Sequence, residues 1–127
     1  MDGNVNILNW FEIPVADMVR AKNFYQTIFS ITLAESTMMD YVMCMFPMEN
    51  GNGRVSGALV QGPNYVPSAT GARIYFNGNP DMATVLEKIE GAGGKITLPK
   101  TKISDEVGYM AFFTDSEGNS VALHSQN

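Results

Sequence analysis

The stretch that decides the fold is Asn9-Trp-Phe-Glu-Ile-Pro-Val15, which is followed after one residue by Asp17-Met-Val-Arg-Ala-Lys-Asn-Phe-Tyr25. In residues 10–15 apolar side chains alternate with an indole, an acid and a proline, which predicts a β-strand with one apolar face. That face consists of Phe11, Ile13 and Val15. A strand with one apolar face needs a partner that covers it.

The covering element is a helix that begins at Met18. Asp17 is a suitable N-cap, because its side chain can accept a hydrogen bond from a backbone N–H in the first turn. An apolar stripe follows at helical spacing and is expected to cover the strand: Ala21, Phe24, Tyr25, Ile28 and Phe29. Trp10 and Glu12 then project from the opposite side of the sheet, which makes that side the candidate site.

Length and composition limit the class of protein. The 127 residues fit one domain, residues 1–127, and a single cysteine, Cys44, excludes an intrachain disulfide. The chain has no long apolar run and no signal-like N-terminus, so we expect a cytoplasmic protein without a membrane partner. Thirteen acidic against eight basic residues give a net charge of −5, which argues against nucleic acid as a partner.

Five of the nine methionines fall in one short segment: Met38, Met39, Met43, Met45 and Met48. Flexible thioethers fill irregular gaps in a core or form adaptable surfaces. The segment therefore predicts a methionine-rich core or subunit interface, with an adaptable binding surface as the alternative.

The two halves of the chain repeat one order of elements. In the first half, strands are predicted at 31–34, 41–46 and 55–60, with a turn at 50–53. A linker at 62–71 precedes a strand at 72–77, a helix opened by Pro80 and Asp81, and strands at 95–98, 109–113 and 120–124. The Asp-Met pair at 17–18 recurs at 81–82 and the Ala-Leu pair at 58–59 recurs at 122–123, both at an offset of 64 residues. This duplication predicts two modules, at about 7–61 and 72–125.

Three motifs carry a family resemblance: Asp17-Met-x-Arg-Ala-x-x-Phe-Tyr25, Glu90-x-Ala-Gly-Gly-Lys-Ile96 and Asp115-Ser-Glu-Gly-Asn-x-Val-Ala-Leu123. With the two-module order, they resemble the vicinal oxygen chelate superfamily, which includes glyoxalase I, bleomycin-resistance proteins and extradiol dioxygenases. The likeness runs from about residue 7 to residue 124. It implies an α+β fold of two tandem βαβββ modules, whose mixed sheet curls into a cup with helices outside and the site inside. It also implies a homodimer.

In metal-dependent members the ligands lie on the cup faces of the strands. The resemblance puts those positions at Trp10, at Ala122 and at or beside Ala58. The remaining position is Arg73 if Ile74 and Phe76 face the helix, or Ile74 in the alternative pairing, and neither side chain is a metal ligand. An indole, a guanidinium and two methyl groups offer no N, O or S donor, so we expect no metal site and no cofactor. A substitute set is conceivable from Glu12 and His124 with Cys44, Glu106 or a second subunit.

The predicted cup still carries polar groups. Strand alternation places His124 and Ala122 on the same side as Trp10 and Glu12, and gives one face to Arg73, Tyr75 and Asn77. We predict Glu12 and His124 as catalytic candidates, and Trp10, Arg73, Tyr75 and Asn77 as ligand-binding residues. The simpler interpretations are an ion pair between Glu12 and Arg73, a frayed surface position for His124 near the C-terminus and a core position for Trp10.

Three functions are compatible with this set. The first is metal-free binding of a small aromatic or acidic molecule in the cup. The second is a glyoxalase-like lyase or isomerase, in which Glu12 removes a proton next to a carbonyl and Arg73 or Tyr75 stabilises the enolate oxygen. The third is a non-enzymatic interaction or regulatory module. The sequence leaves open whether the protein is an enzyme.

Overall fold

The computed structural model describes residues 1–49 and 53–127, and it contains the predicted order of elements twice. The first module consists of β1 (Trp10–Pro14), α1 (Met18–Phe29), β2 (Ala34–Met38), β3 (Tyr41–Met45) and β4 (Ser56–Gln61). The second consists of β5 (Tyr75–Asn77), α2 (Ala83–Ile89), β6 (Lys95–Ser104), β7 (Gly108–Thr114) and β8 (Ser120–Ser125). The turn predicted at 50–53 falls largely outside the described residues.

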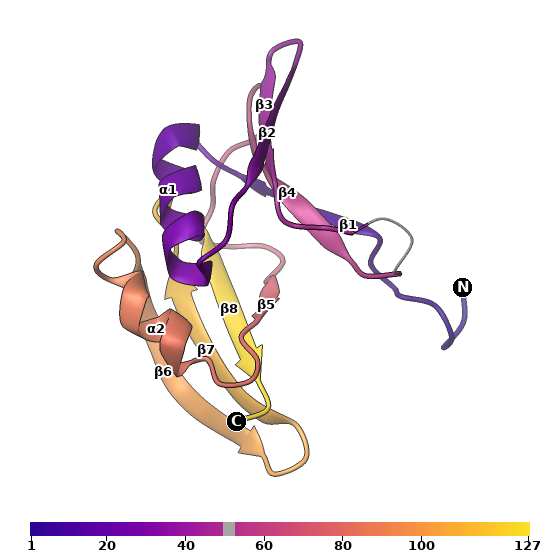
Figure 1. Cartoon of the computed structure of the whole chain (residues 1–127), viewed down its shortest axis with the longest axis vertical. Helices are drawn as coiled ribbons and strands as arrows, with labels where there is room; N and C mark the ends of the chain where they lie inside the picture. Colours follow the sequence, from indigo (N-terminus) through magenta and orange to yellow (C-terminus); the bar gives the residue numbers. More distant parts are fainter. Residues whose placement is uncertain (50–52) are drawn as a thin grey trace.

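Each module forms a four-stranded mixed sheet, and the two sheets have the same topology. The first has the order β1-β4-β3-β2 and the second the order β5-β8-β7-β6. In both, the first and last strands of the module run parallel, and the other neighbours are antiparallel. The predicted α+β class is therefore confirmed, and Figure 1 shows the two sheets inclined to each other with both helices on one side of the molecule.

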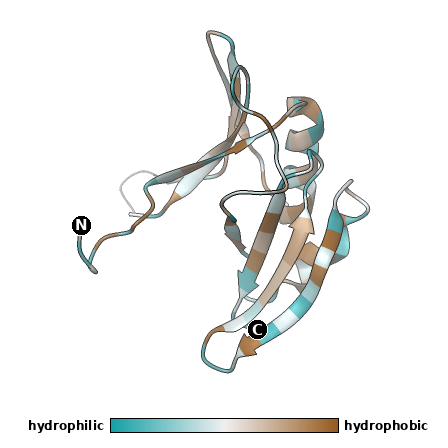
Figure 2. Ribbon diagram, turned by 180° about the vertical axis from the view of Figure 1, so that it is seen from behind, coloured by the Kyte–Doolittle hydropathy of each residue, from teal (hydrophilic) through white to brown (hydrophobic). Residues whose placement is uncertain are grey.

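Some boundaries differ from the prediction. The strand expected at 31–34 lies at Ala34–Met38 instead. Leu33 is buried against the core, whereas every residue of β2 is exposed. Strand β2 is therefore held by its backbone pairing with β3. The strand expected at 95–98 extends to Ser104 as β6, along which Figure 2 shows alternating hydrophilic and hydrophobic bands. Neither helix in the described chain has the length and apolar composition needed to span a bilayer.

Helix α1 joins the two modules. Asp17 caps it as predicted, its side chain accepting a hydrogen bond from the backbone N–H of Arg20 at 3.1 Å. The predicted stripe is confirmed, since Ala21, Phe24, Tyr25 and Ile28 are all buried. The Phe24 ring lies 6.2 Å from Phe113 of β7, and the Tyr25 ring lies 5.6 Å from Phe76 of β5. The helix of the first module thus packs on the sheet of the second.

The β7–β8 turn makes a second connection between the modules. The buried Asp115 accepts a hydrogen bond from the Tyr25 hydroxyl at 2.7 Å. The Glu117 carboxylate accepts bonds from the backbone N–H of Ala16 at 3.0 Å and of Asp17 at 2.8 Å, and from Nε of Arg20 at 2.7 Å. The Asp115–Asn119 motif therefore holds the start of α1, about 100 residues away in sequence.

Candidate functional site

The first feature of the site is the direction in which the side chains of β1 point. Ile13 is 3% exposed, whereas Trp10 is 37% exposed and Glu12 is exposed on the other side of the strand. The predicted orientation of this strand is therefore confirmed, and a core position for Trp10 is wrong. The Glu12 carboxylate accepts a hydrogen bond from the Tyr65 hydroxyl at 2.5 Å and one from Nε1 of Trp10 at 3.3 Å.

A cavity of about 310 Å³ lies in front of Glu12, and we call it the Glu12 pocket. It is lined by residues from β1, the β2–β3 hairpin, β4 and the linker: Glu12, Met38, Tyr41, Met43, Val60 and Tyr65. The Tyr41 and Tyr65 rings meet edge to face, with centroids 5.7 Å apart. The hydrogen bond to the Glu12 carboxylate raises the pKa of the Tyr65 phenol, because the phenolate would lose this donor and face a negative charge.

Sequence reasoning missed Tyr65, because it treated residues 62–71 only as a linker. An aromatic residue among turn formers was the one signal available. Met38 and Met43 show that part of the methionine segment lines a cavity, while Met39 is 89% exposed and Met48 is 53% exposed. A core role for Met38, Met39 and Met48 is wrong.

The second sheet presents another set of side chains. Tyr75 pairs with Ala122 and Asn77 with His124 across β5 and β8, and Phe76 is buried in the core, so the predicted phase of this strand is also confirmed. Phe112 pairs with Ala122 from the other side, in β7. These pairings place Tyr75, Ala122 and Phe112 in one row on the face of the sheet away from the helices.

Arg73 lies over this row. Its guanidinium carbon is 3.8 Å from the centroid of the Phe112 ring, and its Nη2 lies 3.4 Å from the Ser120 hydroxyl. The Tyr75 ring, 50% exposed, meets Phe112 edge to face at 6.2 Å. A cationic plane and two rings thus form an exposed platform, which we call the Arg73 platform: Arg73, Tyr75 and Phe112.

The other two predicted residues of this sheet have local partners. The Asn77 side-chain oxygen accepts a hydrogen bond from the backbone N–H of Asn79 at 2.9 Å, within the turn that leads to α2. His124 is half-buried, and its Nε2 lies 2.6 Å from the carbonyl oxygen of Val107 in the β6–β7 turn. A frayed position for His124 near the C-terminus is wrong, because the residue lies within β8 and this contact holds its ring.

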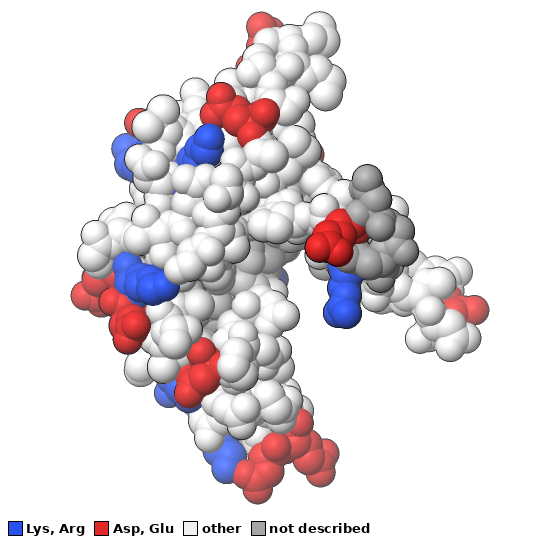
Figure 3. Space-filling view, viewed as in Figure 1, with Lys and Arg blue, Asp and Glu red and all other residues white. Residues whose placement is uncertain are grey.

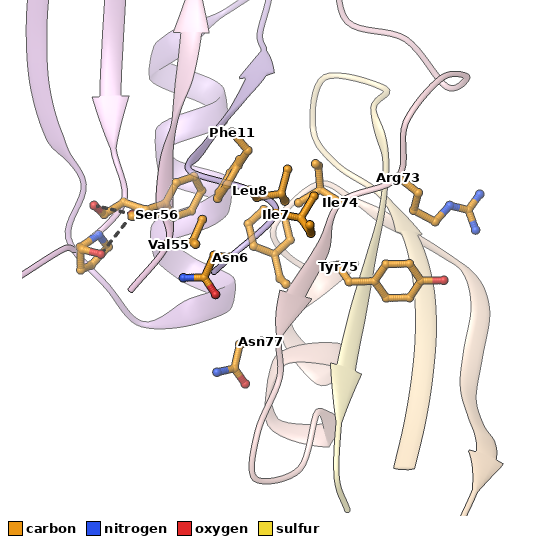
Figure 4. Close-up of a pocket in the computed structure, with 13 residues that line it drawn as sticks. Asn6, Ile7, Leu8, Phe11, Val55, Ser56, Arg73, Ile74, Tyr75 and Asn77 are labelled. Carbon is orange, nitrogen blue, oxygen red and sulfur yellow. Dashed lines mark hydrogen bonds between the residues drawn. The ribbon is translucent and has the colours of Figure 1, made fainter. Parts of the chain in front are cut away.

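A cavity of about 610 Å³ separates the two sheets. Its walls come from the segment Asn6–Leu8, from Phe11 and Val55 of the first module, and from residues 73–77 of the second. Figure 4 shows Ile7, Leu8 and Ile74 close together on one side, while Arg73 and Tyr75 point away from them. Figure 3 shows a hollow between the N-terminal segment and the second sheet, and the side formed by the second sheet is mostly uncharged.

The structure does not bring Glu12 and Arg73 together as an ion pair. Among the described residues the salt bridges join other partners, and Arg73 contacts Phe112 and Ser120 while Glu12 contacts Tyr65 and Trp10. A small cavity of about 270 Å³ lies between the two groups, lined by both Glu12 and Ser120. The predicted polar residues therefore form two groups with opposite charge, one on each sheet.

The donor set does not fit a metal ion at the positions that the resemblance implies. The confirmed phase of the strand that contains Phe76 leaves Arg73 at the ligand position of the second module. Ala58 pairs with Glu12, and Ala122 pairs with Tyr75. None of the side chains at these positions can donate a lone pair to a divalent cation. Over residues 1–49 and 53–127, no group of three or more His, Cys, Asp or Glu side chains is arranged to hold a metal.

Two βαβββ modules, joined through α1 and carrying polar groups on their exposed sheet faces, define a paired-module α+β protein. The chain belongs to the Glyoxalase/Bleomycin resistance protein/Dioxygenase superfamily, whose family model matches residues 7–123. This confirms the resemblance in the sequence. A comparison with curated protein sequences found no match.

Solved structures show the same fold. A glyoxalase/bleomycin-resistance/dioxygenase domain from Frankia sp. EAN1pec has a TM-score of 0.72 at 14% identity, over 97% of this chain and 99% of that one. TnmS3, an antibiotic binding protein from Streptomyces sp. CB03234, has a TM-score of 0.63 at 21% identity, over 97% and 98%. Glyoxalase I from Zea mays has a TM-score of 0.67 at 20% identity, over 91% of this chain and 43% of its own, so this chain spans about half of the maize enzyme.

Proposed function

We propose that the protein binds a small organic molecule without a metal ion, on the sheet faces that carry the Arg73 platform and the Glu12 pocket. The observation that carries this proposal is the Arg73 platform, where a guanidinium 3.8 Å from the centre of the Phe112 ring stands beside the exposed Tyr75. Aromatic walls with a few convergent polar groups are typical of small-molecule sites, and Arg73 and Tyr75 also line the cavity between the sheets. The protein TnmS3, which has the same fold, is an antibiotic binding protein, which supports a binding role.

The platform favours an aromatic or acidic ligand. A guanidinium offers a planar fork of N–H donors that matches a carboxylate, and the contact with Phe112 helps to hold that fork in place. The described residues provide no acidic partner within ion-pair distance of Arg73, so its charge is available to a ligand. Tyr75 supplies a ring against which an aromatic ligand can pack.

Benzoate is a suitable first probe, because it combines a ring with a carboxylate. We expect benzoate to raise the melting temperature of the protein and benzamide, its neutral analogue, to raise it less. Arg73→Gln should weaken benzoate binding about tenfold, the usual size of a lost charge-assisted hydrogen bond, while Lys95→Gln, which removes an exposed positive charge at the start of β6, should leave it unchanged. Equal binding of benzoate by wild type and Arg73→Gln would refute the role of the platform.

The same experiment tests the metal-free character. Benzoate binding should be unchanged after dialysis against EDTA. Loss of binding on dialysis, with recovery on addition of one divalent metal, would show that the site depends on a metal after all.

A lyase or isomerase remains the second candidate, and one contact favours it. The Tyr65 hydroxyl lies 2.5 Å from Glu12, so a proton removed by the carboxylate has a phenol beside it that could complete a transfer to a substrate oxygen. Given a turned-over substrate, Glu12→Gln should lower kcat at least a hundredfold, which is typical of general-base removal. An unchanged rate would remove this candidate.

A further inference from the structure

We propose that the Glu12 pocket binds the ammonium group of an organic cation. This rests on the proposed function of small-molecule binding, and it adds a second subsite with its own chemical class. The Arg73 platform on the other sheet has the opposite charge and recognises a different group.

The charge of the pocket is the first argument. Glu12 is exposed, and in the described part of the chain no Lys, Arg or His lies within ion-pair distance of its carboxylate. Each carboxylate oxygen accepts one hydrogen bond, from Tyr65 or from Trp10. A carboxylate has about four acceptor positions, so roughly half remain for a ligand. These two donors come from side chains on different segments and fix the orientation of the carboxylate.

The walls are the second argument. Tyr41 and Tyr65 meet edge to face at an interplanar angle of 78°, so the corner between them presents an aromatic face and an aromatic edge. A cation over an aromatic face is attracted by the ring quadrupole, and quaternary ammonium groups are recognised by cages of such rings. Met38 and Met43 add polarizable thioethers, and Val60 adds an apolar floor against which N-methyl groups can pack.

The size and sign of the pocket exclude other classes. Its volume of about 310 Å³ is at the low end of the range for small-molecule sites, about 300–1,000 Å³, which suits a head group. A carboxylate or phosphate would meet the negative charge of Glu12 in a pocket without a basic side chain among its lining residues. A neutral apolar group would leave the free acceptor positions of Glu12 without a donor.

The test uses choline and its neutral carbon isostere, 3,3-dimethylbutan-1-ol, which have the same shape and differ in charge. Trp10 is the only tryptophan and its Nε1 donates to Glu12, so its fluorescence reports directly on the pocket. We expect choline to change this fluorescence saturably and to bind about tenfold or more tightly than the isostere, with an affinity that falls as salt is added.

Two variants distinguish the contribution of the Glu12 charge from that of the Tyr41 ring. Glu12→Gln keeps the shape of the side chain and should weaken choline binding about tenfold, to the level of the isostere. Tyr41→Leu should also weaken choline more than the isostere, because it removes a ring and keeps apolar contact. Glu87→Gln removes one negative charge from the exposed side of α2 and should leave choline binding unchanged. Unchanged melting temperatures would show that the variants fold.

Each other outcome is decisive. Equal affinity for choline and its isostere, or full choline binding by Glu12→Gln, overturns the ammonium site. Binding of benzoate without binding of choline overturns the ammonium site and leaves the proposed function standing. If neither probe binds at concentrations up to about 10 mM, which exceeds useful small-ligand dissociation constants, both the ammonium site and the proposed function are contradicted.

Discussion

At the scale of single residues, the Glu117 carboxylate accepts hydrogen bonds from four other residues. Its side chain has no solvent-exposed surface, and it accepts hydrogen bonds from two backbone N–H groups, from Arg20 and from the Ser116 hydroxyl. Burial alone would raise the pKa of Glu117, but the hydrogen bonds outweigh burial and lower the pKa from 4.5 to about 2. The charged form is therefore the one that stabilises the fold.

We expect Glu117→Gln to lower the free energy of unfolding by about 2–3 kcal/mol at pH 7. A shift of one pKa unit corresponds to about 1.4 kcal/mol, and the full figure is reduced because solvent screens the half-exposed Arg20. Since the pKa of the folded state lies below that of the unfolded state, this stabilisation is full above about pH 4.5 and is lost as the pH falls towards 2. Urea unfolding of both proteins at several pH values measures the difference.

The difference between wild type and Glu117→Gln should therefore shrink on acidification. Glu87→Gln, at an exposed position of α2, serves as the control and should stay close to wild type at every pH. A difference that persists at pH 2 would mean that packing, and not the charge of Glu117, holds the turn to α1.

Residue orientation was predictable where one strand face had to be buried. The alternation around Ile13 placed Glu12 and Trp10 away from the core, and the same argument placed Arg73 and Tyr75 opposite Phe76. Side-chain partners were not predictable, because they are distant in the sequence. Glu12 is hydrogen-bonded to Tyr65, 53 residues away, and Glu117 to Arg20, 97 residues away. Such contacts depend on how distant segments of the chain come together, which no local pattern encodes.

At the scale of elements, the end of α2 depends on glycines with different roles. A Cβ on Gly94 would lie 2.7 Å from the backbone oxygen of Thr114 and 2.7 Å from Cε1 of Phe24. Gly94 therefore allows the start of β6 to pass close to β7 and to the buried ring of α1. A Cβ on Gly91 would meet nothing within 4 Å.

The two glycines form a matched pair for mutation. Gly94→Ala should lower the free energy of unfolding by about 1–3 kcal/mol, the usual range for overpacking, because the backbone oxygen of Thr114 cannot move aside like a flexible side chain. Gly91→Ala should leave stability unchanged or raise it by up to about 1 kcal/mol, since alanine restricts the unfolded chain. Thermal unfolding of the two variants distinguishes them, and equal effects would contradict a close approach at Gly94.

Elements were predicted well where they bury an apolar face and poorly where they do not. Helix α1 has five apolar residues at helical spacing, and its start at Met18 was predicted correctly. Strand β2 is exposed on both faces, so its sequence carries no alternation that locates it, and its position is set by pairing with β3. The linker likewise has no periodic pattern, which is why Tyr65 was missed.

At the scale of the whole molecule, the two sheets share a core on the side of the helices and diverge on the other side. Residues of both modules form one hydrophobic cluster, in which Ile13, Tyr25 and Phe76 meet. On the divergent side, β1 and β5 are not hydrogen-bonded to each other in the described chain, and the cavity of about 610 Å³ lies between the sheets. The two proposed subsites, with opposite charge, therefore lie on different sheets.

The same region leaves apolar side chains uncovered. Ile7 is 72% exposed, Leu8 is 55% exposed and Val55 is 39% exposed, and all three line the large cavity. Clustered apolar residues on a surface favour contact with another protein. We therefore propose, as the sequence resemblance implied, that a second copy of the chain covers this surface.

Light scattering coupled to gel filtration tests this proposal. We expect the wild type to elute with twice the chain mass of 13.9 kDa, and Ile7→Glu to shift the protein towards the monomer, because a charge buried in an interface without a partner is costly. Val19→Glu is the matched control: Val19 is 74% exposed on α1 and is not among the residues that line the cavity, so the change should leave the mass unchanged. A monomeric wild type, or a dimer insensitive to Ile7→Glu, would show that the N-terminal segment is not the interface. In that case the open side of the cavity would be available to ligand in a single chain.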